Sequence, residues 1–467
     1  MLRKKYHLDQ KFRTLLQLTG KMDAEMVEID QILDDENLLE LVEADLSKRS
    51  SHATKTGRNS TPVEVILRMI VLKHLRCLSY EKTIKNVSES LVLRQFCRVY
   101  FQPLPNKSTL IRWSNQISET TLKKLNQRLT QMAIELQLTK AQKMRTDGTV
   151  VATNIHFPSD NSLLVDGVRV MSRLLYKAKE ILSSNSKIHP RLFQNRYRTA
   201  RKISRNIDSL SQARSQLGRQ NREQAYRRLL EVTQASLKQA QKVQVLLKDS
   251  TDLKAAKVGR ALAIFIPRAT QVIAQSSRRV LRQERVPAHE KLVSIFEAHT
   301  DIICRGKPNL STEFGHKVWL DEVDGGLISN YRVLKGNPHD TQQWVESLDQ
   351  HLQIFGRPPK QASADRGVYS HPNENYAQKL GVKQVILPKG GYKSKERDNF
   401  ERKRNFQKGR RWHNGIEGRI SVLKRCFGLE RCLYKTSRGF ERWVGWAIIA
   451  HNLASMSRNL SKTDKNA

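Results

Sequence analysis

Three acidic residues, far apart in the sequence, have the type and the setting that metal-dependent phosphate chemistry requires. Glu417 is the one acidic residue between positions 402 and 429, where the chain also carries nine Lys or Arg residues. Asp147 lies within one short segment that is typical of a strand, and Asp365 directly follows another. Mg²⁺ prefers oxygen ligands, and two such ions about 3.5 to 4 Å apart can activate an attacking oxygen and stabilise a leaving one. We therefore expect Asp147, Asp365 and Glu417 to be catalytic ligands of two Mg²⁺ ions, with Mn²⁺ as a substitute, although the ordinary role of any one of them is a surface ion pair.

The residues around these carboxylates predict the elements that must hold them. Residues 143–153 are rich in β-branched side chains and predict a strand that contains Asp147. Residues 315–320 and 325–334 predict an antiparallel hairpin through the turn Asp324-Gly325-Gly326. Residues 361–364 predict a strand that ends at Asp365, and a helix (373–380) and a strand (384–387) follow. This order predicts an RNase H-like domain of the α+β or α/β class, a mixed sheet flanked by helices, in which distant carboxylates converge on one side of the sheet.

The helix expected around Glu417 has two distinct faces. His413, Glu417 and Lys424 lie together on one face, and the adjoining face is an apolar stripe of Trp412, Ile416, Ile420, Leu423 and Phe427. Gly415 and Gly418 would each destabilise such a helix by about 1 kcal/mol relative to Ala. We therefore expect either the sheet or a bound DNA strand to approach this backbone closely.

The His-Asp pair at His339-Asp340 has a plainer explanation than catalysis. Asp340 at the start of a helix, with Gln343 three residues later, matches a capping box. We therefore expect Asp340 to cap a helix that ends near Gly356.

Residues 61–140 predict a helical domain. Thr61-Pro62-Val63-Glu64 has a capping Thr, a Pro at the first helical position and a Glu three residues after the cap. Further helices are expected from Ser79, over 91–97, from Ser108 and over 122–138. The helix over 108–117, which carries Arg112, is the candidate recognition element of a helix-turn-helix-like DNA-binding domain, although a helical scaffold that contacts no bases fits equally well. Residues 1–60 are mixed, end in a polar stretch from 47 to 60, and are expected to form an arm or linker.

Residues 166–300 predict a basic, all-helical insertion after the first strand. Apolar residues from Phe193 to Leu217 recur at spacings of three, four or seven, and a second such segment follows a break at Gly218. Between positions 171 and 290 there are 26 Lys or Arg and 8 Asp or Glu residues, a net +18. A run of charged residues usually forms a solvent-exposed face, but this excess of basic residues favours contact with phosphates or with a partner. The expected domains are the arm (1–60), a DNA-binding domain (61–140), an RNase H-like catalytic domain (141–165 and 301–430), the insertion (166–300), and a C-terminal helix and tail (431–467).

The composition of the whole chain favours a nucleic-acid partner. The 467 residues include 83 Lys or Arg and 45 Asp or Glu, and the formal net charge is +38. Neutralised phosphates release counterions, so such a chain binds DNA or RNA tightly at low salt. A membrane surface is the competing partner, but no apolar run approaches the roughly 20 residues of a spanning helix. The five cysteines are scattered and never spaced as CxxC, which argues against a disulfide framework or a zinc site. We expect a soluble, cytoplasmic protein with no membrane partner.

In these motifs the chain resembles the DDE transposases of bacterial insertion sequences, and among them the ISNCY-type enzymes. The residues that carry the resemblance are 145–151 with 157–164, Ala364-Asp365-Arg366-Gly367, and Glu417-Gly418-Arg419-Ile420-Ser421 with Lys424. The likeness covers most of residues 61–452. It implies hydrolytic release of 3′-hydroxyls at the ends of the element, and then attack of those hydroxyls on target DNA, with no covalent protein intermediate.

The resemblance also implies roles for residues around the acidic trio. Lys424, seven residues after Glu417, would contact DNA near the cleavage point. Related families often carry a Tyr and an Arg seven and four residues before the Glu, where this chain has Arg410 and His413. The expected DNA contacts are Lys424, His413, Arg419, Arg425, Arg410, Arg411 and Arg112. Because two ends must be joined, the protein is expected to act on double-stranded DNA as a homodimer, associated with a bacterial nucleoid.

Two other functions fit a strongly basic chain. A tyrosine or serine recombinase needs a nucleophilic hydroxyl among clustered Arg and His residues, and none of the eleven tyrosines lies in such a cluster. A non-catalytic DNA-binding relative, or a repressor of the element, is the alternative, and the intact acidic trio argues against it.

Overall fold

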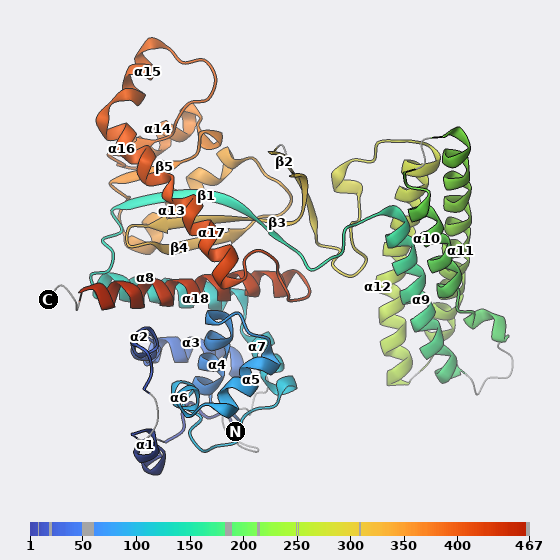
Figure 1. Ribbon diagram of the computed structural model, residues 1–467, viewed down its shortest axis with the longest axis horizontal. Helices are drawn as coiled ribbons and strands as arrows, with labels where there is room; N and C mark the ends of the chain where they lie inside the picture. The colour runs from blue at the N-terminus through green and yellow to red at the C-terminus, as the bar shows by residue number, and fades with distance from the viewer. Residues whose placement is uncertain are drawn as a thin grey trace. The chain divides into compact units, whose positions relative to one another are not determined.

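The computed structural model describes residues 1–7, 9–17, 21–48, 60–182, 189–212, 215–248, 250, 252–307 and 310–463. The chain divides into two compact units (Figure 1). The main unit is Met1–Thr153 with His316–Ala467, and the insertion unit is Asn154–Gly315. Over the described residues, no helix has the length and apolar character needed to cross a bilayer.

Most of the segment 1–60 is folded, so the prediction of an arm or linker was wrong. It contains α1 (Gln10–Leu16), α2 (Ala24–Ile32) and α3 (Glu36–Ser47). Asp23 and Asp35 cap α2 and α3 by accepting backbone N–H groups of the first turn. Leu39 and Val42 are fully buried in a core that α2 and α3 share with α4 (Val63–Leu75). The polar stretch 47–60 lies mostly outside the described residues.

The predicted helices of residues 61–140 are present. They are α4, α5 (Tyr80–Glu89), α6 (Leu91–Phe96), α7 (Lys107–Gln116) and α8 (Glu119–Glu135). Ser79 caps α5 by accepting the Lys82 N–H at 3.1 Å, as expected. The capping role given to Thr61 was wrong, because the cap position of α4 is Pro62 and no side chain bonds there. Asn106, rather than a residue at 108, caps α7.

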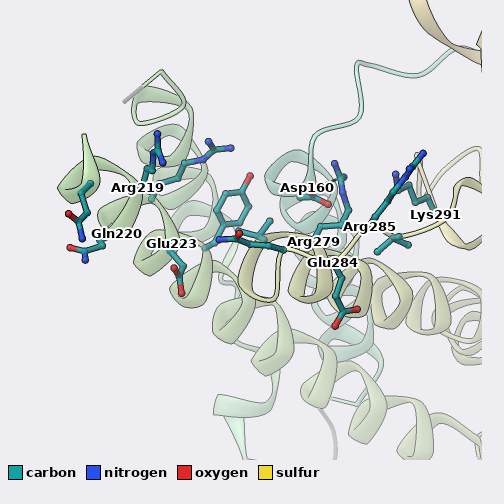
Figure 2. Close-up of a pocket in the computed structure, with 14 residues that line it drawn as sticks. Asp160, Arg219, Gln220, Glu223, Arg279, Glu284, Arg285 and Lys291 are labelled. Carbon is teal, nitrogen blue, oxygen red and sulfur yellow. Dashed lines mark ion pairs between the residues drawn. The ribbon is translucent and has the colours of Figure 1, made fainter. Parts of the chain in front are cut away.

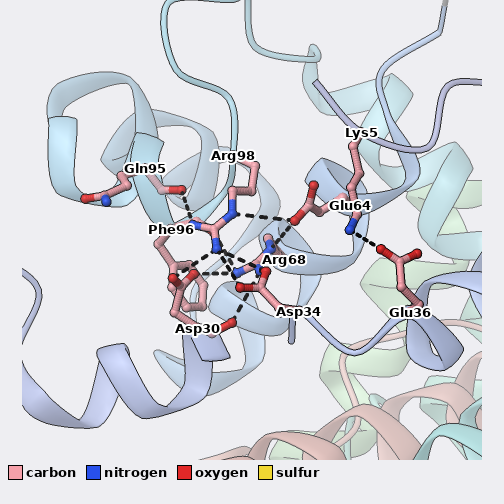
Figure 3. A network of polar contacts seen from close by, with 9 residues as sticks. All are labelled: Lys5, Asp30, Asp34, Glu36, Glu64, Arg68, Gln95, Phe96 and Arg98. Atoms are coloured by element: carbon pink, nitrogen blue, oxygen red, sulfur yellow. Dashed lines mark hydrogen bonds and ion pairs between the residues drawn. The ribbon is translucent and has the colours of Figure 1, made fainter. Parts of the chain in front are cut away.

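A network of arginines and carboxylates joins α2, α4 and the turn after α6 (Figure 3). Arg68 has no exposed surface, and its guanidinium pairs with Asp30 and Asp34, both at 2.6 Å, and with Glu64 at 3.1 Å. Arg98 pairs with the same two aspartates at 3.0 Å. Burial raises the pKa of Glu64 above its ordinary value, against the pull of the two arginines. We call these five residues the arginine network; it fastens α2 to the core helix α4.

The described strands form one mixed sheet, as the predicted fold class requires. β1 (Lys143–Ala152) lies between β3 (Leu310–Val323) and β5 (Gln361–Ala364), β6 (Gln384–Ile386) pairs with β5, and β4 (Leu327–Val333) pairs with β3. β1, β5 and β6 are parallel neighbours, and β3 and β4 form the expected antiparallel hairpin. β2 (Asp301–Lys307) pairs with the first residues of β3, inside the insertion unit. The mixed sheet, flanked by helices and preceded by a helical region, confirms the RNase H-like fold class.

The two faces of the sheet are covered by different helices. α13 (Trp344–Phe355) and α14 (His371–Lys379) cover one face, where Trp319 and Trp344 are buried. α17 (Gly415–Phe427) and α18 (Ser437–Thr463) cover the other, where Val318 and Leu320 are buried (Figure 1). Alternate residues of β3 thus enter opposite cores, as side chains of a strand must. Gly356, with a positive φ of 66°, ends α13 as expected.

The helix expected around Glu417 is interrupted. α15 (Lys395–Arg402) leads to α16 (Arg404–His413), and a turn at Asn414 separates α16 from α17. Trp412 and His413 therefore end one helix, whereas Glu417 and Lys424 belong to the next.

The insertion unit is a helical bundle, which confirms the helical texture predicted for it. Its long helices are α9 (Asp160–Leu182), α10 (Tyr197–Ser209), α11 (Gln216–Lys248) and α12 (Leu253–Ser276), and they share one apolar core. The remaining short elements are the 3-10 helices η1 (Pro190–Phe193), η3 (Ala288–Glu290), η4 (Asp340–Gln343) and η5 (Arg366–Val368), and the π-helix η2 (Ser277–Leu281). Gly218 is no break between helices, because it lies in the first turn of α11.

Candidate active site

Asp147 and Asp365 lie side by side in sequence register on neighbouring parallel strands. The last paired residues of β1 and β5 are Thr146 and Ala364, and each aspartate is the next residue along. An Oδ1 atom of Asp147 accepts the Gly148 N–H at 2.7 Å, and that of Asp365 accepts the N–H of the following residue at 2.6 Å. Asp365 is exposed, at the point where β5 gives way to η5. The two carboxylates thus lie next to each other where β5 ends, on two inner strands of the sheet.

Arg145 fixes the start of α17 against β1. Its guanidinium donates to both carboxylate oxygens of the buried Glu322 on β3, at 2.8 and 2.6 Å, and to the backbone oxygen of Trp412. A Cβ atom on Gly415 would lie 2.3 Å from Nη1 of Arg145. The close approach expected at Gly415 is therefore made by an arginine of the sheet, whereas a Cβ on Gly418 would meet no described atom within 4 Å.

Glu417 is exposed on the first turn of α17, and this turn is held over the face to which Arg145 points. Arg145 and Asp147 are two residues apart in β1, so their side chains leave the same face of the sheet. Arg419, two residues after Glu417, pairs with Glu322 at 3.2 Å and contacts Nε2 of His451 at 3.3 Å. Arg419 was expected to contact DNA, but its guanidinium is engaged inside the protein.

The donor set suits a hard divalent cation, because all three predicted ligands are carboxylates. Asp365 and Glu417 are exposed and Asp147 is half-buried, so each side chain is accessible. Within the described part of the chain, no three His, Cys, Asp or Glu side chains lie close enough together to hold a metal ion. The structure thus brings the three supporting elements to one face but does not itself assemble a metal centre.

His413 lies beneath this site rather than on its surface. It is 9 % exposed, and its Nδ1 atom is buried and has no hydrogen-bond partner among the residues that the structure describes. Burial lowers the pKa of His413 to about 4, against the opposing effect of the nearby Asp365 carboxylate. The imidazole is therefore neutral near pH 7, and an ionic contact with a phosphate is not available to it there.

The other basic residues expected to contact DNA lie at or near the surface. Arg410 and Arg411 are exposed at the end of α16, and Arg425 is exposed on α17, where Lys424 is half-buried. Arg112 is exposed on α7, on the helix whose Trp113 is buried in the core of the main unit.

Sequence reasoning missed a charged pair that lies on the opposite face of the sheet from Asp147. The ammonium of Lys317, which is buried on β3, pairs with Asp340 and donates to the Pro338 carbonyl at 3.0 Å. A Cβ on Gly148 would lie 3.1 Å from Cε of Lys317, and one on Gly367 would lie 3.5 Å from Oδ2 of Asp340. The pair therefore lies close to Gly148 and to Gly367, which follow the two aspartates in the sequence.

The helix-capping role predicted for Asp340 was wrong. His339, not Asp340, accepts the N–H of Thr341 at the start of η4, and the α-helix begins only at Trp344. The one signal that could have found the pair is a lysine in the middle of an apolar strand, since a buried ammonium requires an acidic partner.

Two family models match the chain. A transposase domain (DUF772) matches residues 14–116, and a transposase DDE domain matches residues 322–453. The second match includes Asp365 and Glu417, and the first spans α2 to α7. No curated protein matches the chain, and no solved structure does.

Proposed function

This chain belongs to the DDE transposases of insertion sequences, and we propose that it cuts DNA at the ends of its element and joins those ends to target DNA. The observation that carries this proposal is the register of β1 and β5, which sets Asp147 beside Asp365 on adjacent parallel strands. The docking of α17 over the same face supports Glu417 as the third ligand. The finer assignment to the ISNCY-type enzymes rests on the sequence motifs alone.

Asp147, Asp365 and Glu417 would hold two Mg²⁺ ions, and Mn²⁺ would substitute for them. When bound, such ions activate the attacking oxygen and stabilise the leaving oxygen of a phosphodiester. Water would be the first nucleophile and would release a 3′-hydroxyl at the element end. That hydroxyl would then attack the target strand, so no protein side chain becomes covalently linked to DNA.

The surrounding basic residues would hold and orient the DNA. Lys424 lies two turns after Glu417 on α17, so its ammonium would meet a phosphate close to the cut. Arg410, Arg411 and Arg425, which are exposed, would contact the backbone on either side. Arg112 on α7 would contact DNA from the helical region as part of a recognition helix.

Two of the predicted DNA contacts receive other roles. Arg419 would act as a positioning residue, because its pair with Glu322 fixes the helix that carries Glu417. His413 would support the site from below as a neutral side chain. We further propose that two copies of the chain act together on double-stranded DNA, because a transposition event joins two ends.

Cleavage of the element's own ends tests this function. The inverted repeats that flank the coding region supply the substrate, and nicking is measured with Mg²⁺, with Mn²⁺ and with a chelator. We expect metal-dependent nicking by the wild type and a loss of at least a thousandfold in Asp365→Asn, with DNA binding retained. Asp398→Asn is the matched control, because Asp398 is a half-exposed aspartate on α15 that pairs only with Arg402 among the described residues, at 2.7 Å.

Each outcome distinguishes one candidate function. Equal nicking by wild type and Asp365→Asn would refute the assignment of the carboxylate. Specific binding without any nicking by the wild type would identify the chain as a DNA-binding relative or repressor. A covalent protein–DNA adduct would identify a nucleophilic recombinase.

A further inference from the structure

The insertion unit contains a cavity of about 770 Å³ with an unusual charge balance. It lies between the first turns of α11, the turn η2 after α12, and the loop over residues 283–291, with Asp160 of α9 at one side. Figure 2 shows Arg219 on one side and Arg279, Arg285 and Lys291 on the other. All its walls belong to residues 154–315, so the cavity is complete within this unit.

Five cations and three carboxylates line this basic cavity. The cations are Arg219, Arg222, Arg279, Arg285 and Lys291, and the carboxylates are Asp160, Glu223 and Glu284. Among the described residues, only Arg279 of these cations forms an ion pair, with Asp160 at 2.9 Å. Four cations therefore have no carboxylate partner within the part of the chain that the structure describes.

The carboxylates of the cavity are already neutralised, mostly from outside it. Glu223 pairs with Arg227 at 2.6 Å, and Glu284 pairs with Arg278 at 2.8 Å. Neither of those arginines lines the cavity. Each acidic group is thus matched by a separate cation, and the four remaining charges are not cancelled. This surplus is what an anion requires.

The surroundings of the cavity also suit it to an anion. Burial lowers the pKa of Lys291 below its ordinary value, and the neighbouring Arg279 and Arg285 lower it as well, against the opposing effect of Asp160. α11 begins at Gln216, and the N-terminal end of this 33-residue helix carries a partial positive charge directed at an anion placed there. Arg222 also lies over the ring of Tyr226, with its Cζ 5.9 Å from the centroid, which holds the guanidinium at the cavity wall.

We infer that the basic cavity is a phosphate-binding site of the insertion unit, and that it receives backbone phosphates of DNA. Guanidinium groups form forked hydrogen bonds that match phosphate oxygens, and they remain charged at any accessible pH. The volume admits a sugar–phosphate segment, not merely a single ion. That the site binds phosphate follows from the charges; that the phosphate belongs to DNA rests on the proposed function.

The test compares two double variants of the full-length protein with equal charge changes. Arg219→Gln/Arg222→Gln alters the cavity, and both side chains are exposed, so the apolar core stays intact. Arg198→Gln/Arg201→Gln removes two exposed arginines from α10, in the same unit but outside the cavity. Binding of a random-sequence duplex is measured by fluorescence anisotropy over a series of salt concentrations.

We expect the cavity variant to bind the duplex roughly tenfold more weakly at moderate salt. The slope of log K against log salt should become shallower by about 0.9 for each phosphate that the variant no longer neutralises. The α10 variant should change both quantities much less. Equal losses of affinity in the two variants would show that only total charge matters, and would overturn the inference.

A second arm separates DNA from a free phosphate compound. Calorimetric titration with inorganic pyrophosphate measures whether the cavity variant loses affinity for an anion that is not DNA. If pyrophosphate binding falls while duplex binding is unchanged, the assignment to DNA is overturned. Because both readouts measure binding, failure of the wild type to nick DNA would refute the proposed cleavage and leave this inference standing.

Discussion

Two clusters of arginines in this molecule have the same residue types and opposite electrostatic outcomes. In the arginine network of the main unit, Arg68 and Arg98 face three carboxylates, so the cluster is net negative and fully paired (Figure 3). In the basic cavity of the insertion unit, four of five cations have no carboxylate partner among the described residues (Figure 2). The first cluster is closed to an added anion, and the second is open to one.

The difference teaches that the number of basic residues does not identify a binding surface. The whole chain has a formal charge of +38, yet Arg68 contributes to that sum while it is completely buried. A paired and buried guanidinium stabilises a fold, whereas an unpaired one at a cavity can exchange its counterions for phosphate. The partner of each charge, not the charge itself, decides its role.

The largest expected effect comes from breaking the arginine network. In Arg68→Met the carboxylates of Asp30, Asp34 and Glu64 lose the more deeply buried of their two arginine partners. We therefore expect the main unit to lose about 3 to 5 kcal/mol of stability. All six tryptophans lie in this unit, so urea unfolding followed by tryptophan fluorescence reports on it alone.

The matched control for that variant is Arg222→Met in the basic cavity. Arg222 is exposed and has no carboxylate partner among the described residues. We therefore expect its free energy of unfolding to stay within about 0.5 kcal/mol of the wild-type value, measured by urea unfolding followed by far-UV circular dichroism. A comparable loss of stability in the two variants would contradict the distinction between closed and open clusters.

Acid should destabilise the main unit before the insertion unit. Burial lowers the pKa of His351 and His413 to about 4 and that of His451 to about 3. A folded-state pKa below the unfolded value near 6.5 means that stability is fully present above pH 6.5 and is lost as the pH falls toward 4. At pH 5, each of these histidines should therefore lower the free energy of unfolding of the main unit by about 2 kcal/mol relative to pH 7.

The insertion unit supplies the contrast to this acid effect. Burial lowers the pKa of His156, but its hydrogen bond to Asp166 raises the pKa by more, so the net shift is upward. The contribution of His156 to the stability of the insertion unit is therefore lost as the pH rises. We expect tryptophan fluorescence to show greater destabilisation at pH 5 than at pH 7, and His413→Gln to lessen that difference by about 2 kcal/mol. An unchanged pH dependence in His413→Gln would show that this imidazole is not held neutral.

Local signals in the sequence predict much of this fold. The turn at Asp324-Gly325-Gly326, the serine cap at Ser79 and the glycine that ends α13 all depend on a few neighbouring residues. The strand that ends at Asp365 is likewise marked by its own composition. Helices α2 and α3 went unpredicted because each is short and its apolar residues are interspersed with many acidic ones, so their stability depends on burial against α4.

Partners that are distant in sequence are what local patterns do not reveal. Arg419 looks like a DNA contact beside Glu417, but its partner Glu322 is 97 residues away. The pairing of Lys317 with Asp340 likewise depends on the approach of η4 to the sheet. The order of the three carboxylates was predictable from the motifs, whereas the arginine that fixes α17 was not, because only the folded sheet places Arg145 against Trp412 and Glu322.

The smallest expected effect comes from removing one acidic charge from each arginine cluster. In Glu223→Gln the partner of Arg227 is lost, and this exposed pair within one helix contributes only about 0.3 to 0.5 kcal/mol. The cavity becomes more positive, so we expect duplex DNA to bind a few-fold more tightly at low salt, with the salt slope unchanged because no new phosphate is contacted.

The matched variant is Asp34→Asn in the arginine network, which makes the same change in total charge. Arg68 and Arg98 would retain Asp30 and Glu64, so no cation becomes available to DNA and we expect the affinity for the duplex to stay unchanged, while the main unit becomes less stable. Fluorescence anisotropy at low salt compares the two affinities. If both substitutions tightened DNA binding equally, total charge alone would govern the affinity, and the pairing of each arginine would have no influence on where DNA binds.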